Sequence, residues 1–169
     1  DNVQEVPGPT IATRTSPTNM GLALLANLAA RDFGYISTGT LIQRTRDTLA
    51  TLHGLERHRG HFYNWYDTRT PQPLLPVYVS SVDSGNLAGH LLTLGAGLRE
   101  QMDEPLYTPE LFRGIGDTLA VLQELLPSDP SLARLASDLE HAQVRIDADY
   151  VRRKVQGIAR DGDLSKYIL

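Results

Sequence analysis

The chain has 169 residues, which is enough for one domain with a sizeable core. It contains no cysteine, so disulfide bonds and thiolate metal sites are excluded. The 16 lysine and arginine residues against 20 aspartate and glutamate residues give a net charge of −4, which argues against a general nucleic-acid-binding protein. No apolar run approaches the ~18 residues that a membrane-spanning helix needs. The sequence begins at Asp1 rather than at a methionine, so we expect it to be a piece of a longer protein.

The first part of the sequence predicts an extended lead-in followed by a helix. Residues 1–18 contain three prolines and several threonines, which favour extended backbone. Ser16 is a suitable N-cap, Pro17 fits the first helical position, and Gly34 is suited to end the helix. The apolar residues of this helix share one face, as expected for a helix that packs on others; they are Met20, Leu24, Leu25, Leu28 and Ala29.

A second helix is predicted from about Thr40 to Arg57. Basic side chains collect near its C-terminal end, where the helix dipole favours positive charge. Gly60 is expected to end it. The apolar residues that recur at helical spacing predict its buried face; they are Ile42, Leu49, Leu52 and Leu55.

Residues 61–84 show no helical periodicity. The segment opens with HFYNWYDT, contains three prolines, and includes VYVSSV (77–82), which predicts a short strand and leaves room for a small hairpin. Its length is unusual for a structureless connection in a compact domain, and such segments are commonly functional. Its aromatic content argues against disorder.

Three further helices are predicted after this segment. Asp83 or Ser84 is the expected N-cap of the first. Thr108 and Asp129 are the expected caps of the next two, each followed by a proline at the first helical position, and the last helix is expected to extend through Ile158. Because the other connections are short, the chain is predicted to be all-α, with about five helices in antiparallel pairs within a single domain, residues 1–169.

The segment from 61 to 86 has the composition of a sugar-binding site. Aromatic rings stack on the apolar faces of a sugar, while carboxylates and amides pair with its hydroxyls. The rings are Phe62, Tyr63, Trp65 and Tyr66, and the polar groups are Asn64, Asp67, Asp83 and Asn86. The same composition equally suits an aromatic plug that pins the loop onto a helical bundle. Asp83 also has a simpler interpretation as a helix cap, which would keep it ionised and suit a hydroxyl acceptor better than a general acid.

Other kinds of chemistry find little support in the sequence. The five histidines, at positions 53, 58, 61, 90 and 141, lack the spacing of metal ligands, so no metal is expected. No phosphate-binding glycine loop or nucleophile elbow occurs, and no cofactor is expected. Glycosidic chemistry normally uses two carboxylates. Asp32, Asp67 and Asp83 lie near the candidate stretches, but the sequence gives no distance between them, so no catalytic residue is assigned.

Three stretches together resemble one family. RTSPTNMGLALLANLAARDFGY, LERHRGHFYNWYDTRT and YVSSVDSGNLAGHLL, in this order, are similar to the glucoamylase-like middle region of bacterial cyclic β-1,2-glucan synthases. The resemblance covers residues 1 to about 100, and three long motifs in the right order make it specific. The later helices fit less distinctively.

The resemblance implies a fold and a setting for this chain. The parent would be a very large protein of the bacterial inner membrane, with a glycosyltransferase part that builds β-1,2-glucan from UDP-glucose and a phosphorylase-like part further on. The middle region is associated with cyclisation by transglycosylation and resembles an (α/α) toroid. Such a toroid needs more than the five helices predicted here, so the chain would be a partial toroid on the cytoplasmic side of that membrane.

The resemblance also implies partners and site residues. The partners would be a β-1,2-glucan chain, the remaining domains of the parent and, where an open toroid face is exposed, a second copy of the fragment. The residues implied to line the glucan groove are Asn19, Tyr63, Asn64, Trp65, Asp67, Asp83 and Asn86. The leading hypothesis is therefore a glucan-binding part of the cyclisation groove that is inactive alone. The alternative is a helical structural or interaction domain with no ligand site of its own.

Overall fold

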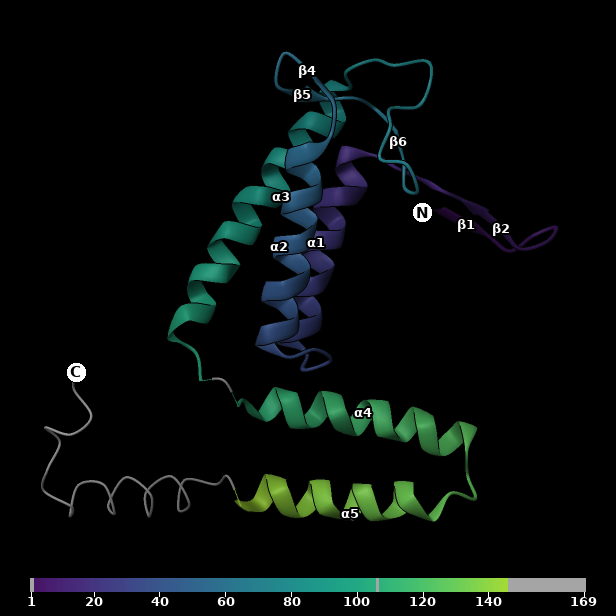
Figure 1. Ribbon diagram of the computed structural model, residues 1–169. Helices are drawn as coiled ribbons and strands as arrows, with labels where there is room; N and C mark the ends of the chain where they lie inside the picture. Colours follow the sequence, from purple (N-terminus) through teal and green to yellow (C-terminus); the bar gives the residue numbers. More distant parts are fainter. Residues whose placement is uncertain (1, 106, 146–169) are drawn as a thin grey trace, which may run out of the picture. The chain divides into compact units, whose positions relative to one another are not determined.

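The computed structural model describes residues 2–105 and 107–145, and the chain divides into two compact units, Asp1–Tyr107 and Thr108–Leu169 (Figure 1). The helices of the first unit are α1 (Pro17–Asp32), α2 (Thr38–Gly54), α3 (Ser81–Glu100) and the short 3₁₀ helix η1 (Gln101–Asp103). The second unit contains α4 (Pro109–Leu125) and α5 (Pro130–Arg145). A single domain over the whole chain stays a prediction.

Three small antiparallel sheets accompany these helices, so the all-α prediction is wrong in part. The described chain is mostly helical, with two-stranded sheets in the first unit. These sheets pair β1 (Asn2–Gln4) with β2 (Thr10–Ala12), β3 (Arg14–Thr15) with β6 (Tyr66–Asp67), and β4 (Arg57–His58) with β5 (His61–Phe62). The extended lead-in therefore pairs its backbone with itself and with the aromatic segment, because extended backbone needs hydrogen-bond partners.

Helix α1 begins as predicted and is central to the first unit. The Ser16 hydroxyl accepts a hydrogen bond from the backbone N–H of Asn19 at 3.3 Å, and Pro17 is the first helical residue. α1 packs against both α2 and α3, and Figure 1 shows α2 running back alongside it. The core cluster that results contains Met20, Leu24, Leu28, Leu41, Leu52, Leu55, Tyr66 and Leu94.

The predicted face of α2 is wrong in part. Ile42 and Leu49 are 57% and 41% exposed, whereas Leu41 and Thr45 are buried. Leu52 is buried as predicted. Leu55, the residue after the helix, is also buried as predicted. Two of the four predicted positions are therefore wrong, and the apolar pattern alone did not fix the rotation of this helix.

The predicted end of α2 is also corrected. The helix ends at Gly54, and the basic residues that follow form the β4–β5 hairpin. Arg59 and Gly60, at its turn, have φ values of 50° and 87°. Two successive residues with positive φ are typical of a two-residue hairpin turn, so Gly60 serves a turn rather than a helix end.

The short strand predicted at 77–82 does not form. Tyr78 instead pairs with Asn64: its carbonyl oxygen accepts from the Asn64 backbone N–H at 2.9 Å, and its own N–H donates to Asn64 Oδ1 at 3.3 Å. Helix α3 already begins at Ser81, and its N-cap is Ser80, whose hydroxyl accepts from the N–H of Asp83 at 3.1 Å. The predicted caps, Asp83 and Ser84, are therefore wrong. Serine is as good an N-cap as aspartate, so residue type alone did not distinguish Ser80 from them.

Helices α4 and α5 begin at the prolines predicted for them. Asp129 Oδ1 accepts from the backbone N–H of Ser131 at 2.9 Å, whereas Thr108 makes no side-chain capping hydrogen bond. The predicted continuation of the last helix through Ile158 lies outside the described residues. None of the helices described within 2–105 and 107–145 is long and apolar enough to cross a membrane.

Tyr66 fastens the aromatic segment to the helices. Its side chain is 1% exposed, and its hydroxyl donates to the Glu56 carbonyl oxygen at 2.6 Å while accepting from the Tyr63 backbone N–H at 2.9 Å. Its ring meets the Phe62 ring edge to face, with centroids 6.4 Å apart. One buried phenol thus satisfies two backbone groups that have no partner in a helix or sheet.

Helices α1 and α3 approach closely because two glycines leave room for side chains of the opposite helix. A methyl group on Gly21 would lie 2.8 Å from Cβ of His90, and one on Gly97 would lie 2.5 Å from Cδ2 of Leu28. Both distances are too short for carbon atoms that are not bonded. The two helices therefore require glycine at these positions.

We expect Gly21→Ala to lower the free energy of unfolding by about 1–3 kcal/mol, because the added methyl group forces α1 and α3 apart. Urea denaturation of the variant would measure the change. Gly89→Ala is the matched control, since Gly89 lies on α3 with no atom within 4 Å of an added methyl group. Helix propensity should make that control more stable by up to about 1 kcal/mol. An unchanged stability of Gly21→Ala would contradict the close approach.

Candidate functional site

The sequence-predicted site residues come from one end of the first unit. They lie in the first turns of α1 and α3 and in the segment 61–80 that joins α2 to α3. Figure 1 shows these two helix N-termini and the segment at the same end of the helices. The candidate residues are thus brought to one region of the molecule, in three separate groups.

The first group is a polar cluster that joins α1 to α3. Thr18 donates from its hydroxyl to Asp83 Oδ1 at 2.6 Å and accepts from Asn86 Nδ2 at 3.1 Å. Asp83 and Asn86 are three residues apart in the first turns of α3, so both side chains project from the same helix face. Asp83 is partly buried, whereas Asn86 is exposed. A carboxylate, a hydroxyl and an exposed amide are the groups that recognise sugar hydroxyls.

The carboxyl group of Asp83 is held in its charged form. Burial raises the pKa of this group, but hydrogen bonds from the side chains of Thr18, Ser80 and Ser16 outweigh burial and lower the pKa below its ordinary value of 3.8. Asp83 therefore suits a charged hydrogen-bond acceptor and not a general acid. The sequence predicted the same role, although it attributed the charge to capping.

The second group is Trp65 with Arg14. Trp65 is partly exposed, and the Arg14 guanidinium lies 4.9 Å from the centre of its ring. Arg14 also pairs through its backbone with Asp67, in the β3–β6 sheet. The cation holds the indole ring by a cation–π interaction and orients a flat aromatic surface at the end of the helices.

The third group surrounds Asp67. Its carboxylate accepts hydrogen bonds from the backbone N–H groups of Arg69 and Thr70 at 2.7 and 3.1 Å and from the Arg69 guanidinium at 3.0 Å. These bonds, those from Arg69 first, lower the pKa of Asp67 to about 2. Asp67 is thus a permanently charged turn residue at neutral pH.

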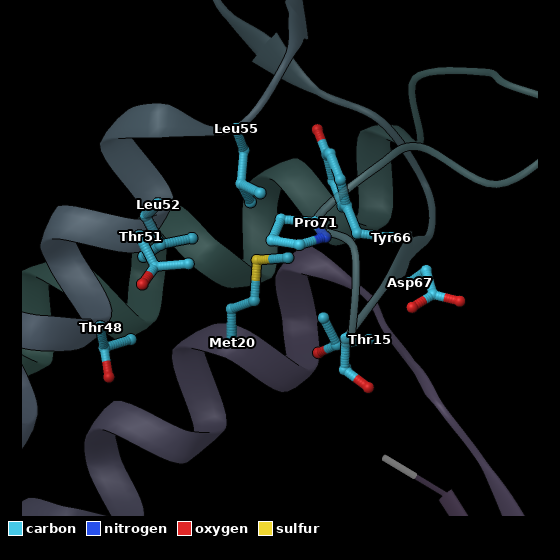
Figure 2. A pocket seen from close by; sticks show the side chains of 10 residues that line it. Thr15, Met20, Thr48, Thr51, Leu52, Leu55, Tyr66, Asp67 and Pro71 are labelled. Carbon is cyan, nitrogen blue, oxygen red and sulfur yellow. The ribbon is translucent and has the colours of Figure 1, made fainter.

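Asp67 also lies at the edge of a pocket of about 210 Å³ (Figure 2). The lining comes from β3, α1, the C-terminal part of α2 with the residue after it, and the segment around β6. It consists of Thr15, Met20, Thr48, Thr51, Leu52, Leu55, Tyr66, Asp67, Thr68 and Pro71. Trp65, Asp83 and Asn86 are not among these residues. The pocket is therefore separate from the polar cluster at Thr18.

The remaining predicted residues have structural contacts. The side chain of Asn64 is 4% exposed and accepts from Tyr78, as described above. Tyr63 packs against the apolar core. The backbone N–H of Asn19 donates a hydrogen bond to the capping hydroxyl of Ser16. The plug interpretation of the aromatic segment therefore fits Asn64 and Tyr66, which pack the loop against the helices.

Three features of this region were not predicted from the sequence. Thr18 is the hydroxyl that joins Asp83 to Asn86, and Arg14 is the cation on Trp65. The polar run from Arg14 to Asn19 was a signal for both, but their partners lie more than 50 residues away along the chain. The residues of the threonine-lined pocket lie far apart in the sequence and form no recognisable motif. Within the described ranges, no group of three or more histidine, cysteine, aspartate or glutamate side chains could hold a metal ion.

The lowered pKa of Asp67 predicts a pH effect on stability. A carboxyl group whose pKa is lower in the folded chain than in the unfolded chain stabilises the fold above about pH 4, and this contribution is lost as the pH falls toward about 2. Arg69→Ala should raise the pKa of Asp67 toward 3.8 and reduce that loss. A carbon-13 NMR titration of the Asp67 carboxyl group measures the midpoint. A midpoint near 3.8 in the unmodified chain would contradict the role of Arg69.

Comparison with known proteins gives the chain a relative. No family model matches it. Cyclic β-(1,2)-glucan synthase NdvB of Rhizobium meliloti (strain 1021) is 47% identical over 131 residues, which is 77% of this chain, and the chain spans about 5% of the length of that protein. The resemblance found in the three sequence stretches is confirmed at this level, and its assignment to the middle region stays a prediction. The chain is therefore homologous to a segment of a cyclic β-(1,2)-glucan synthase.

Proposed function

We propose that this chain contributes a glucan-binding surface to a cyclic β-1,2-glucan synthase. The observation that carries the proposal is the 47% identity to such a synthase over 131 residues. The chemistry at the end of the first unit supports it, because partly exposed aromatic and polar side chains gather there. The exposed and partly exposed residues of the surface are Asn19, Trp65, Asp67, Asp83 and Asn86, and Tyr63 and Asn64 pack beneath them.

These residues would divide the work of binding. Trp65, held by Arg14, presents a flat face for a glucose ring, and Asn86 presents an exposed amide to its hydroxyls. Asp83 accepts hydrogen bonds as a charged group and fixes Thr18 between α1 and α3. Tyr63 and Asn64 hold the segment in place: Tyr63 packs against the apolar core, and Asn64 accepts a hydrogen bond from Tyr78.

The proposal extends to the setting of the chain in a larger protein. The segment would belong to the region that cyclises the glucan by transglycosylation, as part of an (α/α) toroid on the cytoplasmic side of the bacterial inner membrane. Its partners would be the β-1,2-glucan and the remaining domains of the synthase. We assign no catalytic residue, and we expect the isolated chain to bind glucan without converting it.

Calorimetric titration with linear β-1,2-glucan tests the proposal. We expect the chain to bind, and Trp65→Ala and Asn86→Ala each to weaken binding about tenfold, which corresponds to about 1.4 kcal/mol. Tyr35→Ala is the matched aromatic control, since Tyr35 is 54% exposed and follows the C-terminal end of α1, away from the site. Asp83→Asn removes the charge but keeps an oxygen that can accept from Thr18, so it tests whether the charge of Asp83 contributes to glucan binding.

The alternative of a structural or interaction domain predicts different results. In that case Trp65→Ala lowers the melting temperature sharply, and no heat of glucan binding is observed with the folded chain. Thermal unfolding of each variant, monitored by circular dichroism, separates a lost binding group from a lost fold. Absence of binding by a folded chain would overturn the proposed function.

A further inference from the structure

We propose that the pocket between α1, α2 and the segment around β6 is a subsite for a single glucopyranose ring. The inference rests on the proposed function, and it adds a second place of contact that is separate from the polar cluster at Thr18. Three observations carry it: the distribution of polar and apolar groups around the pocket, its size, and its connection to Trp65.

The lining places apolar groups centrally and polar groups on two sides. Figure 2 shows Met20 and Pro71 facing each other in the middle of the pocket. Thr48 and Thr51 of α2 lie on one side, and Thr15 and Asp67 lie on the other. The Thr51 hydroxyl donates to the Asp47 carbonyl oxygen at 3.0 Å, and the Asp67 carboxylate accepts from Arg69 and Thr70. Thr48 and Thr15, on opposite sides, are therefore the main polar groups for a ligand.

This distribution suits β-glucopyranose. In that ring the hydroxyl groups are equatorial and lie around the rim, while the axial C–H groups form two apolar faces. An apolar floor can pack against one face while polar groups on opposite sides receive the hydroxyls. Ligand sites generally combine apolar walls with a few placed polar groups in this way.

The size of the pocket limits the ligand. At about 210 Å³ it is smaller than the roughly 300–1,000 Å³ of pockets for drug-sized molecules, which favours a small ligand such as one sugar ring over a longer piece of chain. A negatively charged ligand is disfavoured by the ionised carboxylate of Asp67. A cation finds that carboxylate already paired with Arg69 at 3.0 Å. A neutral polyhydroxy ring fits both constraints.

The β3–β6 sheet links the edge of the pocket to Trp65. Asp67, at its edge, pairs through the backbone with Arg14, and the Arg14 guanidinium covers one face of Trp65. The β3–β6 sheet therefore holds the pocket edge and the indole ring in one small unit. A glucan chain that contacts Trp65 can place a neighbouring glucose unit in the pocket.

The two methionines of the chain give a direct test. Met20 lines the pocket, whereas Met102 lies in η1 and is 81% exposed. With carbon-13 methyl-labelled methionine, we expect addition of linear β-1,2-glucan, or of sophorose, the β-1,2-linked disaccharide of glucose, to shift the Met20 methyl signal and leave Met102 unchanged. Thr48→Phe should fill the pocket, abolish that shift and weaken glucan binding at least fivefold. Thr93→Phe, at an exposed threonine of α3, is the matched control and should change neither result.

The outcomes separate this inference from the proposed function. Calorimetric binding of glucan with no change at Met20, or with no effect of Thr48→Phe, would overturn the pocket subsite and leave the proposed function standing. Absence of binding by the folded chain would overturn both. A Met20 shift that persists in Thr48→Phe would show that the methyl signal reports a distant change, and it too would overturn the subsite.

Discussion

The close approach of α1 and α3 is the constraint on which the rest of the first unit depends. Gly21 and Gly97 accept His90 and Leu28 from the opposite helix, so the two backbones come together without a gap. Near the N-terminal ends of the same two helices, the short side chain of Thr18 reaches Asp83, with 2.6 Å between their oxygen atoms. The glycines favour this hydrogen bond, because a short threonine side chain needs the two helices close together. The packing of the core and the geometry of the polar cluster therefore both use the close contact of α1 and α3.

The aromatic segment contains only the short strands β5 and β6, and side chains supply hydrogen bonds that backbone pairing does not. Tyr66 satisfies the Glu56 carbonyl and the Tyr63 N–H, and Asn64 exchanges two hydrogen bonds with Tyr78. Asn64 and Tyr66 are buried, while Trp65 and Asp67 between and after them are only partly so. The two interpretations of this segment, an aromatic plug and a sugar-binding site, therefore apply to alternate residues. Packing is observed for Asn64 and Tyr66, and sugar contact is proposed for Trp65 and Asp67.

Local signals in the sequence predicted where most helices begin. The features that depend on contacts between distant residues could not be predicted in the same way. Ser16–Pro17 and the prolines that begin α4 and α5 identified helix starts, because capping depends on a few neighbouring residues. The rotation of α2 was missed because its buried face includes Thr45, which an apolar pattern does not mark, while the apolar residues Ile42 and Leu49 are exposed. The β3–β6 pairing was missed because it joins Arg14 to Asp67, and backbone pairing leaves no mark on either residue type. The candidate residues were found by composition, but Thr18 and the threonine pocket needed the fold.

The two carboxylates of the candidate surface limit the chemistry that the surface can perform. Glycosidic chemistry needs one carboxylic acid that stays protonated near neutral pH, which burial away from hydrogen-bond donors provides. Asp67 and Asp83 have the opposite environment, since donors surround both and lower the pKa of each below its ordinary value. Both groups are charged at neutral pH and can accept hydrogen bonds but cannot donate a proton to a leaving group. Under the proposed function, the two residues would therefore hold a sugar chain as hydrogen-bond acceptors, and the proton donor for a transglycosylation step would be another side chain.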